Sequence, residues 1–119
     1  MNQAIWHEPT VGRNERWAAH HLHGMTVWLS GLSGSGKSTI AHALADRLTS
    51  GGVYNYVLDA DNVRHGLNSD LGFSDHERWE NVRRIAEVAR LFADAGAVTL
   101  VPIIKIGRAS CRERVFRAV

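Results

Sequence analysis

An internal disulfide and a membrane span are both excluded by what this sequence lacks. It has a single cysteine, Cys111, so no internal disulfide can form and a packed core has to hold the fold. No apolar run approaches the length of a membrane span. The first thirty residues carry four charged side chains and four histidines, unlike a secretory signal. We therefore expect a cytoplasmic protein with no membrane partner.

The distribution of charge also disfavours a nucleic-acid partner. The net charge is +2, but residues 1–104 hold nine Lys or Arg against eleven Asp or Glu, whereas residues 105–119 hold five against one. A surface that binds nucleic acid needs positive charge clustered on the folded domain. With 45% apolar and 22% charged residues, the composition is that of an ordinary globular domain.

Short apolar segments predict three buried strands. They lie at residues 25–30, 53–58 and 97–104, and Pro102 interrupts the third. Strands that are apolar nearly throughout, alternating with amphipathic helices, indicate an α/β fold with a parallel sheet covered on both faces. Ligands of such sheets bind at the carboxyl ends of the strands.

Two helices are predicted between these strands. The first has roughly a dozen residues and follows the first strand. The second is longer, with Ser74 or Asp75 as its N-cap, Gly96 at its end, and an i,i+4 pair of Glu80 and Arg84 on its exposed side. Its expected buried stripe is Val82, Ile85, Ala86, Ala89, Phe92 and Ala93.

A glycine-rich phosphate-binding motif follows the first predicted strand. Residues 31–38, GLSGSGKS, match G-x-x-x-x-G-K-[ST] in full, between a strand and a helix. Backbone N–H groups of such a loop surround a phosphate, Lys37 reaches the β- and γ-phosphates, and the Ser38 hydroxyl ligates Mg²⁺. The motif predicts an α/β, P-loop NTPase-like fold that binds the phosphates of a nucleotide together with Mg²⁺; ATP is the nucleotide that the family resemblance below implies. The residues expected to hold the nucleotide are Gly31, Ser33, Gly34, Ser35, Gly36, Lys37, Ser38 and Thr39.

The loop alone leaves the activity open. Kinases, GTPases, motors and ATP-binding regulators all share it. A second candidate site, formed by His20, His21 and His23, is disfavoured because its spacing matches no usual structural zinc site and no neighbouring cysteine or carboxylate completes it.

Beyond the loop, residues 1–104 resemble the adenylylsulfate kinase family. The resemblance is carried by an N-terminal segment with Trp6-His7-Glu8, Val11, Arg13 and Arg16 and by three longer segments: TVWLSGLSGSGKSTIA, VLDADNVRHGLNSDLGFS and RWENVRRIAEVARLFADAGAV. The resemblance implies a kinase that uses ATP to phosphorylate the 3′-hydroxyl of adenosine 5′-phosphosulfate in sulfate assimilation. A homodimer is implied for a complete enzyme of this family.

The same resemblance implies roles for individual residues. Lys37 and Asp61 are the implied catalytic residues, with Asp61 orienting or accepting the proton of the attacking 3′-hydroxyl. Ser38 and Asp59 are the implied metal ligands. The acceptor nucleotide would be held through its phosphosulfate and ribose, and Phe73 would stack on its adenine. The implied acceptor contacts are Asp61, Arg64, Phe73, Arg78 and Asn81.

Structural roles compete with two of these assignments. Asp61 would also serve as the N-cap of a short helical turn from Asn62 to His65. Asp59 would also be a common turn residue, because aspartate often follows the end of a strand. Two other activities stay open as well: phosphorylation of a different small metabolite or nucleotide by a P-loop kinase, and nucleotide binding without catalysis.

The chain departs from the family pattern in two places. Ala60 stands where the pattern usually has glycine, and the resemblance stops at Ile104. Residues 105–119 look like a translated sequencing adapter, although a genuine basic C-terminal helix is the alternative. We therefore expect residues 1–104 to be the N-terminal part of a kinase domain, truncated after its third strand and inactive alone, and residues 105–119 to be a non-native tail.

Overall fold

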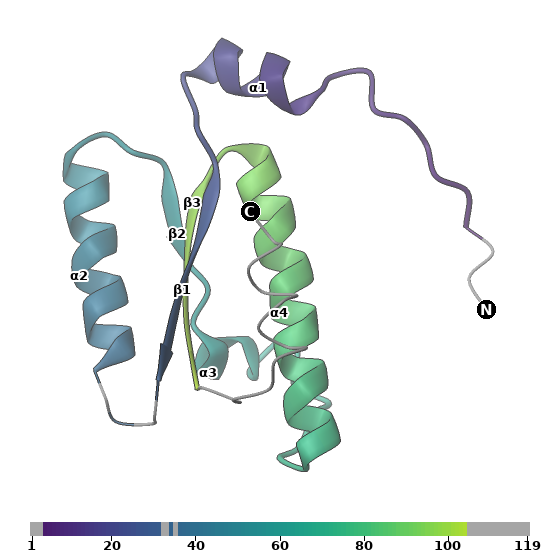
Figure 1. Cartoon of the computed structure of the whole chain (residues 1–119), viewed down its shortest axis with the longest axis vertical. Coiled ribbons are helices and arrows are strands. Elements are labelled where there is room, and N and C mark those ends of the chain that lie inside the picture. Colours follow the sequence, from purple (N-terminus) through teal and green to yellow (C-terminus); the bar gives the residue numbers. More distant parts are fainter. Residues whose placement is uncertain (1–3, 32–33, 35, 105–119) are drawn as a thin grey trace.

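Three parallel strands form the centre of the structure (Figure 1). The computed structural model describes residues 4–31, 34 and 36–104, and within them the strand order is β1-β3-β2. Both outer strands pair in parallel with the central one, so all three carboxyl ends lie at one edge of the sheet. The strands are β1 (Met25–Gly31), β2 (Asn55–Val57) and β3 (Val98–Ile104).

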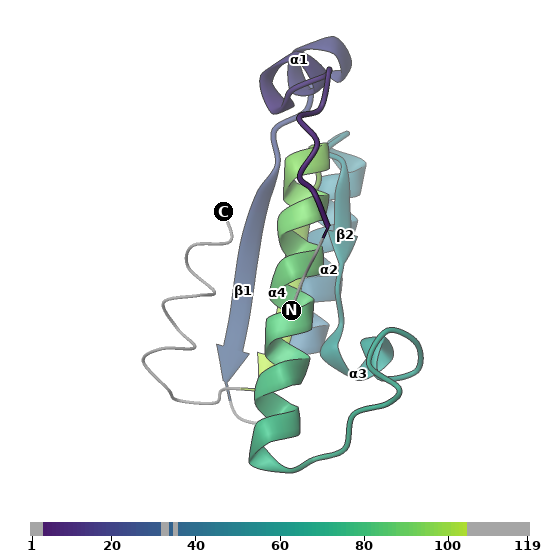
Figure 2. The same ribbon diagram turned by 90° about the vertical axis from the view of Figure 1, so that its right-hand side faces the viewer.

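Helices cover both faces of this sheet. In Figures 1 and 2, α2 (Lys37–Ser50) lies against one face and α4 (Asp75–Ala95) against the other. Ser74 caps α4 as expected, because its hydroxyl accepts a hydrogen bond from the Glu77 N–H at 3.2 Å. The helix ends at Gly96, whose φ of 111° is a left-handed conformation that favours glycine. The predicted α/β fold class is confirmed.

The central strand is buried on both faces, which explains why its sequence is apolar nearly throughout. Alternate residues of β3 point to opposite sides of the sheet. Toward α2 the buried cluster consists of Ala41, Val98 and Leu100. Toward α4 it consists of Leu58, Val82, Ile85, Ala89, Val101 and Ile103.

Pro102 is tolerated in the central strand because the neighbouring strand stops before it. The Val98 N–H donates to the Tyr54 carbonyl at 2.9 Å, and the Leu100 carbonyl accepts from the Leu58 N–H at 2.8 Å. Residues 98, 100 and 102 therefore face β2, which pairs no further than Leu100. The nitrogen of Pro102 faces a position where no ladder bond is required.

The elements differ from those predicted in three respects. β2 is shorter than residues 53–58, a short α3 (Ala60–Val63) follows it, and α1 (Arg13–His20) has no counterpart among the predicted elements. α1 has the sequence RNERWAAH, in which Trp17 is the one large apolar side chain, so the repeated apolar positions that predict a helix are missing. It is attached at the carboxyl end of α4, where Trp17 Nε1 donates to the Asp94 carbonyl at 2.9 Å.

None of the helices in the described part of the chain combines the length and apolarity that crossing a bilayer requires.

Gly24 provides a test of the packing between the start of β1 and the end of α4. A Cβ at this position would overlap the carbonyl oxygen of Ala93, and backbone cannot move aside as a flexible side chain would. We predict that Gly24→Ala lowers the free energy of unfolding by about 1–3 kcal/mol or more, as measured by urea denaturation. Gly66→Ala is the matched control, because a Cβ there meets nothing within 4 Å. Equal stability of the two variants would contradict the packing described.

Candidate functional site

The phosphate-binding motif joins the end of β1 to the start of α2. Gly31 ends the strand, and Lys37 is the first residue of the helix. Gly34 and Gly36 have φ values of 81° and 88°, with no atom within 4 Å of a Cβ built on either. A loop in this conformation needs glycine and leaves open space beside its backbone. Ser33 and Ser35, two of the predicted phosphate contacts, lie outside the described residues.

The N-terminus of α2 has the properties of an anion site. Its N-cap is Gly36, which has no side chain to occupy the first N–H groups of the helix. These groups and the helix dipole favour a negatively charged ligand, and the adjoining loop supplies room for one. Ser38 and Thr39 are exposed in this first turn. The predicted phosphate site is consistent with this geometry.

Asp59 connects the phosphate loop to the next turn of the chain. Its Oδ2 accepts a hydrogen bond from the Ser38 hydroxyl at 3.1 Å, and His42 Nε2 lies 3.9 Å from the same oxygen. A hydroxyl and a carboxylate are hard oxygen ligands of the kind that Mg²⁺ prefers. The predicted metal ligands, Ser38 and Asp59, are therefore adjacent, and both fit the ion. Among the described residues, no cluster of three or more His, Cys, Asp and Glu side chains could hold a metal.

The cap of the short helix α3 is Asp59, which corrects the alternative reading of Asp61 as the capping residue. Asp59 Oδ1 accepts a hydrogen bond from the Asp61 N–H at 2.9 Å. The helix starts at Ala60 rather than at Asn62 because the carboxylate one position earlier satisfies its first free N–H groups. Asp61 itself is exposed within this helix, so its side chain is not used as the cap.

Arg64 and Phe73 face each other across the loop that leads to α4. The guanidinium carbon of Arg64 lies 4.3 Å from the centre of the Phe73 ring, and its Nη1 donates to the carbonyls of Leu71 and Gly72 at 3.3 and 3.0 Å. Phe73 is 67% exposed, so one face of the ring is available for stacking. The arrangement pairs a cation with an open aromatic surface.

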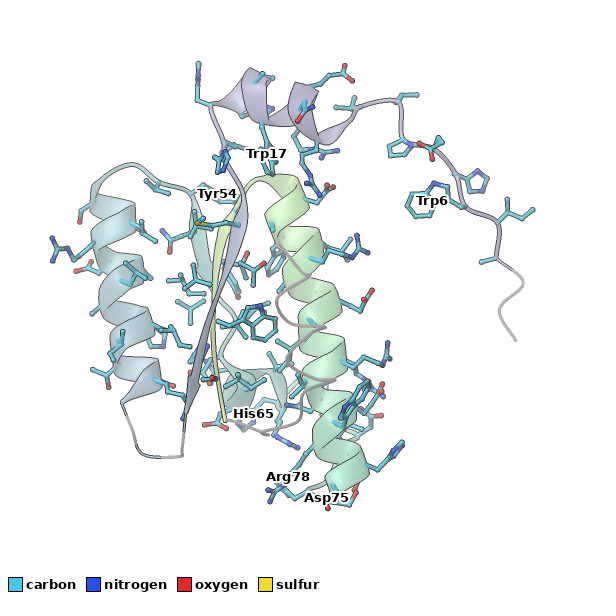
Figure 3. The ribbon with its side chains drawn as sticks, in the orientation of Figure 1. Trp6, Trp17, Tyr54, His65, Asp75 and Arg78 are labelled. Atoms are coloured by element: carbon cyan, nitrogen blue, oxygen red, sulfur yellow. The ribbon has the colours of Figure 1, made fainter. Side chains whose placement is uncertain are left out.

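Arg78 and Asn81 lie on the first turns of α4 but in different surroundings. Arg78 is exposed at the end of the molecule where the strands finish, close to Asp75 and on the same side as His65 (Figure 3). Asn81 is 5% exposed, and its Oδ1 accepts from Asn68 Nδ2 at 2.8 Å. The Arg78 side chain can therefore move toward a ligand without rearrangement of its neighbours, whereas the Asn81 side chain cannot.

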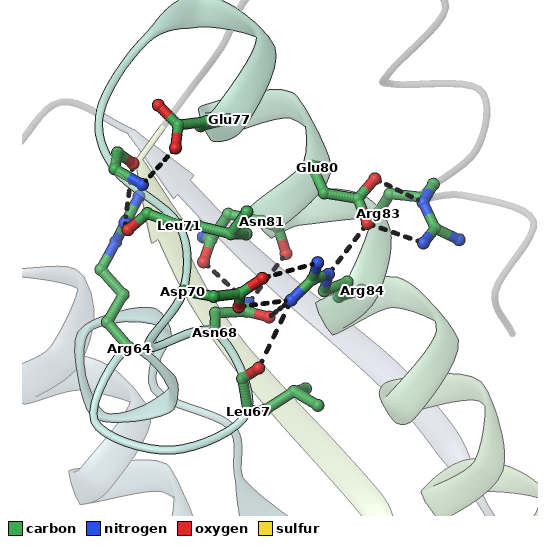
Figure 4. A network of polar contacts seen from close by, with 11 residues as sticks. Arg64, Leu67, Asn68, Asp70, Leu71, Glu77, Glu80, Asn81, Arg83 and Arg84 are labelled. Atoms are coloured by element: carbon green, nitrogen blue, oxygen red, sulfur yellow. Dashed lines mark hydrogen bonds and ion pairs between the residues drawn. The ribbon is translucent and has the colours of Figure 1, made fainter.

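A polar network joins α4 to the loop before it (Figure 4). Arg84 binds both oxygens of Asp70, at 2.8 and 3.2 Å, and its Nε donates to Glu80 at 2.9 Å, which confirms the predicted i,i+4 pair. Glu80 also accepts two hydrogen bonds from Arg83 at 2.8 Å. These bonds hold the pKa of Glu80 down at about 2, with Arg83 the larger cause and Arg84 the second.

The neighbouring carboxylates are shifted in the same direction. The hydrogen bond from Arg84 is the main cause that lowers the pKa of Asp70. The pKa of Glu77 is lowered first by the Gly72 N–H and then by the Ser74 hydroxyl, which donate to it at 2.7 and 2.8 Å. All three carboxylates are ionised at neutral pH, so the loop stays joined to the helix there.

Asn68, Asp70 and Glu77 form this network, yet none was singled out from the sequence as part of the site. They lie in or beside a turn segment in which neither strand alternation nor helical spacing is present. Burial of Asn68, which is 0% exposed, is visible only once the loop folds back on α4. The segment VLDADNVRHGLNSDLGFS, which carries the resemblance to the family and contains Asn68, is the signal that could have indicated it.

A glycine-rich loop joins a strand to a helix, and a serine and an aspartate lie side by side at the carboxyl edge of the parallel sheet. This arrangement defines a P-loop nucleotide-binding protein. The model of the family described as "Adenylylsulphate kinase" matches residues 23–118, and the chain belongs to this family.

Individual relatives agree with this assignment. A probable adenylyl-sulfate kinase of Halalkalibacterium halodurans is 55% identical over 100 residues, which cover 84% of this chain and 50% of that protein. An adenylyl-sulfate kinase of Klebsiella pneumoniae is 54% identical over 105 residues, covering 88% and 52%. A structure of the Mycobacterium tuberculosis APS kinase, in complex with AMPPNP and APS, superposes with a TM-score of 0.76 at 49% identity, covering 82% of this chain and 56% of that one. The chain spans about half the length of the curated relatives it matches.

Acidification should weaken the network at the start of α4. A carboxylate whose pKa is lower in the folded state stabilises that state above its unfolded pKa, about 4.5 for Glu80, and this stability is lost as the pH falls toward 2. We predict that Glu80→Gln is less stable than the parent at pH 7 and that the difference shrinks at pH 2.5. Urea denaturation at both pH values measures it. A difference that does not change with pH would contradict the role assigned to Glu80.

Proposed function

We propose that this chain forms the phosphate-binding and acceptor-binding half of an adenylyl-sulfate kinase. The reaction is transfer of the γ-phosphoryl group of ATP to the 3′-hydroxyl of adenosine 5′-phosphosulfate, a step of sulfate assimilation. The observation that carries the proposal is the hydrogen bond from Ser38 to Asp59, because it joins the end of the phosphate loop to the turn that bears Asp61 and Arg64. Donor and acceptor regions thus meet at one edge of the sheet.

On the donor side, the loop and the start of α2 bind the phosphates of ATP. Lys37 lies at the helix N-terminus, where its ammonium group neutralises charge on the β- and γ-phosphates. Ser38 and Asp59 hold Mg²⁺, which supplies further neutralisation of the phosphates when it is bound. The other contacts of this side are Gly31, Ser33, Gly34, Ser35, Gly36 and Thr39.

On the acceptor side, Asp61 and the start of α4 hold the second nucleotide. The exposed carboxylate of Asp61 orients the 3′-hydroxyl and accepts its proton, since it lies on the turn held beside Ser38. Arg64, Arg78 and Asn81 bind the phosphosulfate and ribose, and Phe73 stacks on the adenine through the ring face opposite Arg64. A Thiobacillus denitrificans relative is described as a hexameric APS kinase. A homodimer and a cytoplasmic location stay predictions for the present protein.

The phosphate loop is tested by Lys37→Ala. The substitution removes a charge-assisted phosphate contact from the first residue of α2 and takes no volume from the buried clusters, so ATP binding should fall below detection while the fold persists. Calorimetric titration with ATP and Mg²⁺ measures the affinity, and circular dichroism checks the fold. Arg47→Ala, in the last turn of the same helix, is the matched control and should bind normally. Unchanged affinity of a folded Lys37→Ala variant would rule out the loop assignment.

The acceptor side is tested in a completed enzyme, in which residues 1–104 are joined to the C-terminal half of the Klebsiella pneumoniae relative. Arg78→Ala should raise the apparent KM for adenosine 5′-phosphosulfate about tenfold or more and leave that for ATP within about twofold, because a charged hydrogen bond to one nucleotide is lost. Asn81→Ala should act in the same direction. Arg90→Ala, an exposed arginine of the same helix, is the control. A rise in the KM for ATP instead would overturn the assignment, and a panel of other hydroxyl acceptors identifies any different substrate.

A further inference from the structure

A fully buried amide lies behind the acceptor side of the site. Asn68 is 0% exposed, and its Nδ2 donates to Asn81 Oδ1 at 2.8 Å and more weakly to the Asn81 carbonyl at 3.4 Å (Figure 4). Both bonds run from the loop before α4 to one residue of that helix. A buried polar side chain is costly unless its bonds are made, so this pairing restrains both side chains.

The pairing determines which end of the Asn81 side chain is turned outward. An asparagine amide has one accepting oxygen and one donating nitrogen, set on opposite sides of the same planar group. Since the oxygen of Asn81 is used by Asn68, the nitrogen is directed to the other side. Asn81 therefore presents a donor, which suits phosphosulfate and ribose oxygens that accept hydrogen bonds.

Arg84 secures the segment that carries Asn68. One guanidinium nitrogen, Nη1, binds Asp70 at 2.8 Å and lies 3.5 Å from both the Leu67 carbonyl and Asn68 Oδ1. The second, Nη2, binds the other Asp70 oxygen at 3.2 Å. The contacts to Leu67 and Asp70 together hold the loop on both sides of Asn68, and the two-pronged bond to Asp70 is one that a planar guanidinium makes and an ammonium cannot.

We propose that Asn68 is a positioning residue that orients the Asn81 amide with its donor toward the acceptor nucleotide, and that Arg84 holds Asn68 in place. The inference rests on the proposed function of the site. Asn68 touches no substrate in this scheme. It acts by excluding the reversed orientation, in which the Asn81 oxygen would face the anionic phosphosulfate and repel it.

The completed enzyme described above, carrying Asn68→Asp, tests the orientation. The substitution keeps the size of the side chain but replaces the donor by a second acceptor, so the Asn81 amide should reverse to donate inward. The apparent KM for adenosine 5′-phosphosulfate should rise about tenfold or more, with the KM for ATP within about twofold of the parent. Asn55→Asp is the matched control, because its Nδ2 bonds to Thr49 Oγ1 at 2.9 Å at the opposite end of the sheet.

Arg84→Ala tests the second part of the inference and serves if Asn68→Asp fails to fold. Its comparison is Arg83→Ala: both arginines bind Glu80, but only Arg84 reaches the loop. Arg84→Ala should raise the KM for adenosine 5′-phosphosulfate selectively, Arg84→Lys should restore it only in part, and Arg83→Ala should leave it within about twofold of the parent. An equal effect of the two alanine substitutions would overturn the role of Arg84.

Two results would overturn the orientation itself. The first is an Asn68→Asp enzyme whose KM for adenosine 5′-phosphosulfate equals that of the parent. The second is an equal rise in the KM values for both nucleotides together with a lowered melting temperature, which is the result expected of a purely structural residue. A parent enzyme that does not phosphorylate this acceptor would instead refute the proposed function. In that case, the NMR signals of the Asn81 side-chain amide test the orientation without any substrate. These signals should move downfield in Asn68→Asp, and unchanged signals would contradict the inference.

Discussion

The carboxylate of Asp59 is the connection on which the site depends. One oxygen accepts the Ser38 hydroxyl bond and the other accepts the Asp61 N–H, so a single side chain fixes the start of α2 relative to α3. These two helices follow different strands of the sheet, and the two bonded residues, Ser38 and Asp59, are 21 positions apart in the chain. This bridge joins the start of α2 directly to the turn after β2, in addition to the packing of α2 on the sheet.

The start of α4 is held in place by different interactions. α4 uses one stripe to form the core, with Ile85 and Ala89 fully buried, and its N-terminal turns to carry Arg78 and Asn81. Arg84 of the helix donates hydrogen bonds to Asp70 in the loop before it, and Glu77 of the helix accepts one from the Gly72 N–H of that loop. These charged hydrogen bonds, rather than apolar packing, join the loop to the helix. Packing therefore sets the direction of the helix, and polar bonds set the shape of the loop before it.

The layered fold was predictable from the sequence, whereas the finer connections were not. Alternating apolar runs and helical stripes gave the strands, α2 and α4, because burial on one or two faces leaves a periodic signal. α1 left no apolar stripe, because it is attached to Asp94 by polar bonds from Arg13, Arg16 and Trp17 rather than by a buried face. The resemblance to the family implied a shared role for Ser38 and Asp59, but the pairing of Asn68 with Asn81 depends on a loop that folds back, which spacing does not encode. The assignment of residues 105–119 as a non-native tail stays a prediction.

Pro102 has a consequence for the shape of the site as well as for the strand that contains it. If β2 continued, the amide at position 102 would be the one to meet the carbonyl of Leu58, and proline has no N–H to give. Extending β2 past Leu100 would therefore leave the Leu58 carbonyl without its ladder partner, so proline at this position favours a short β2. The turn that carries Asp59 begins where this short strand leaves the sheet, beside Ser38.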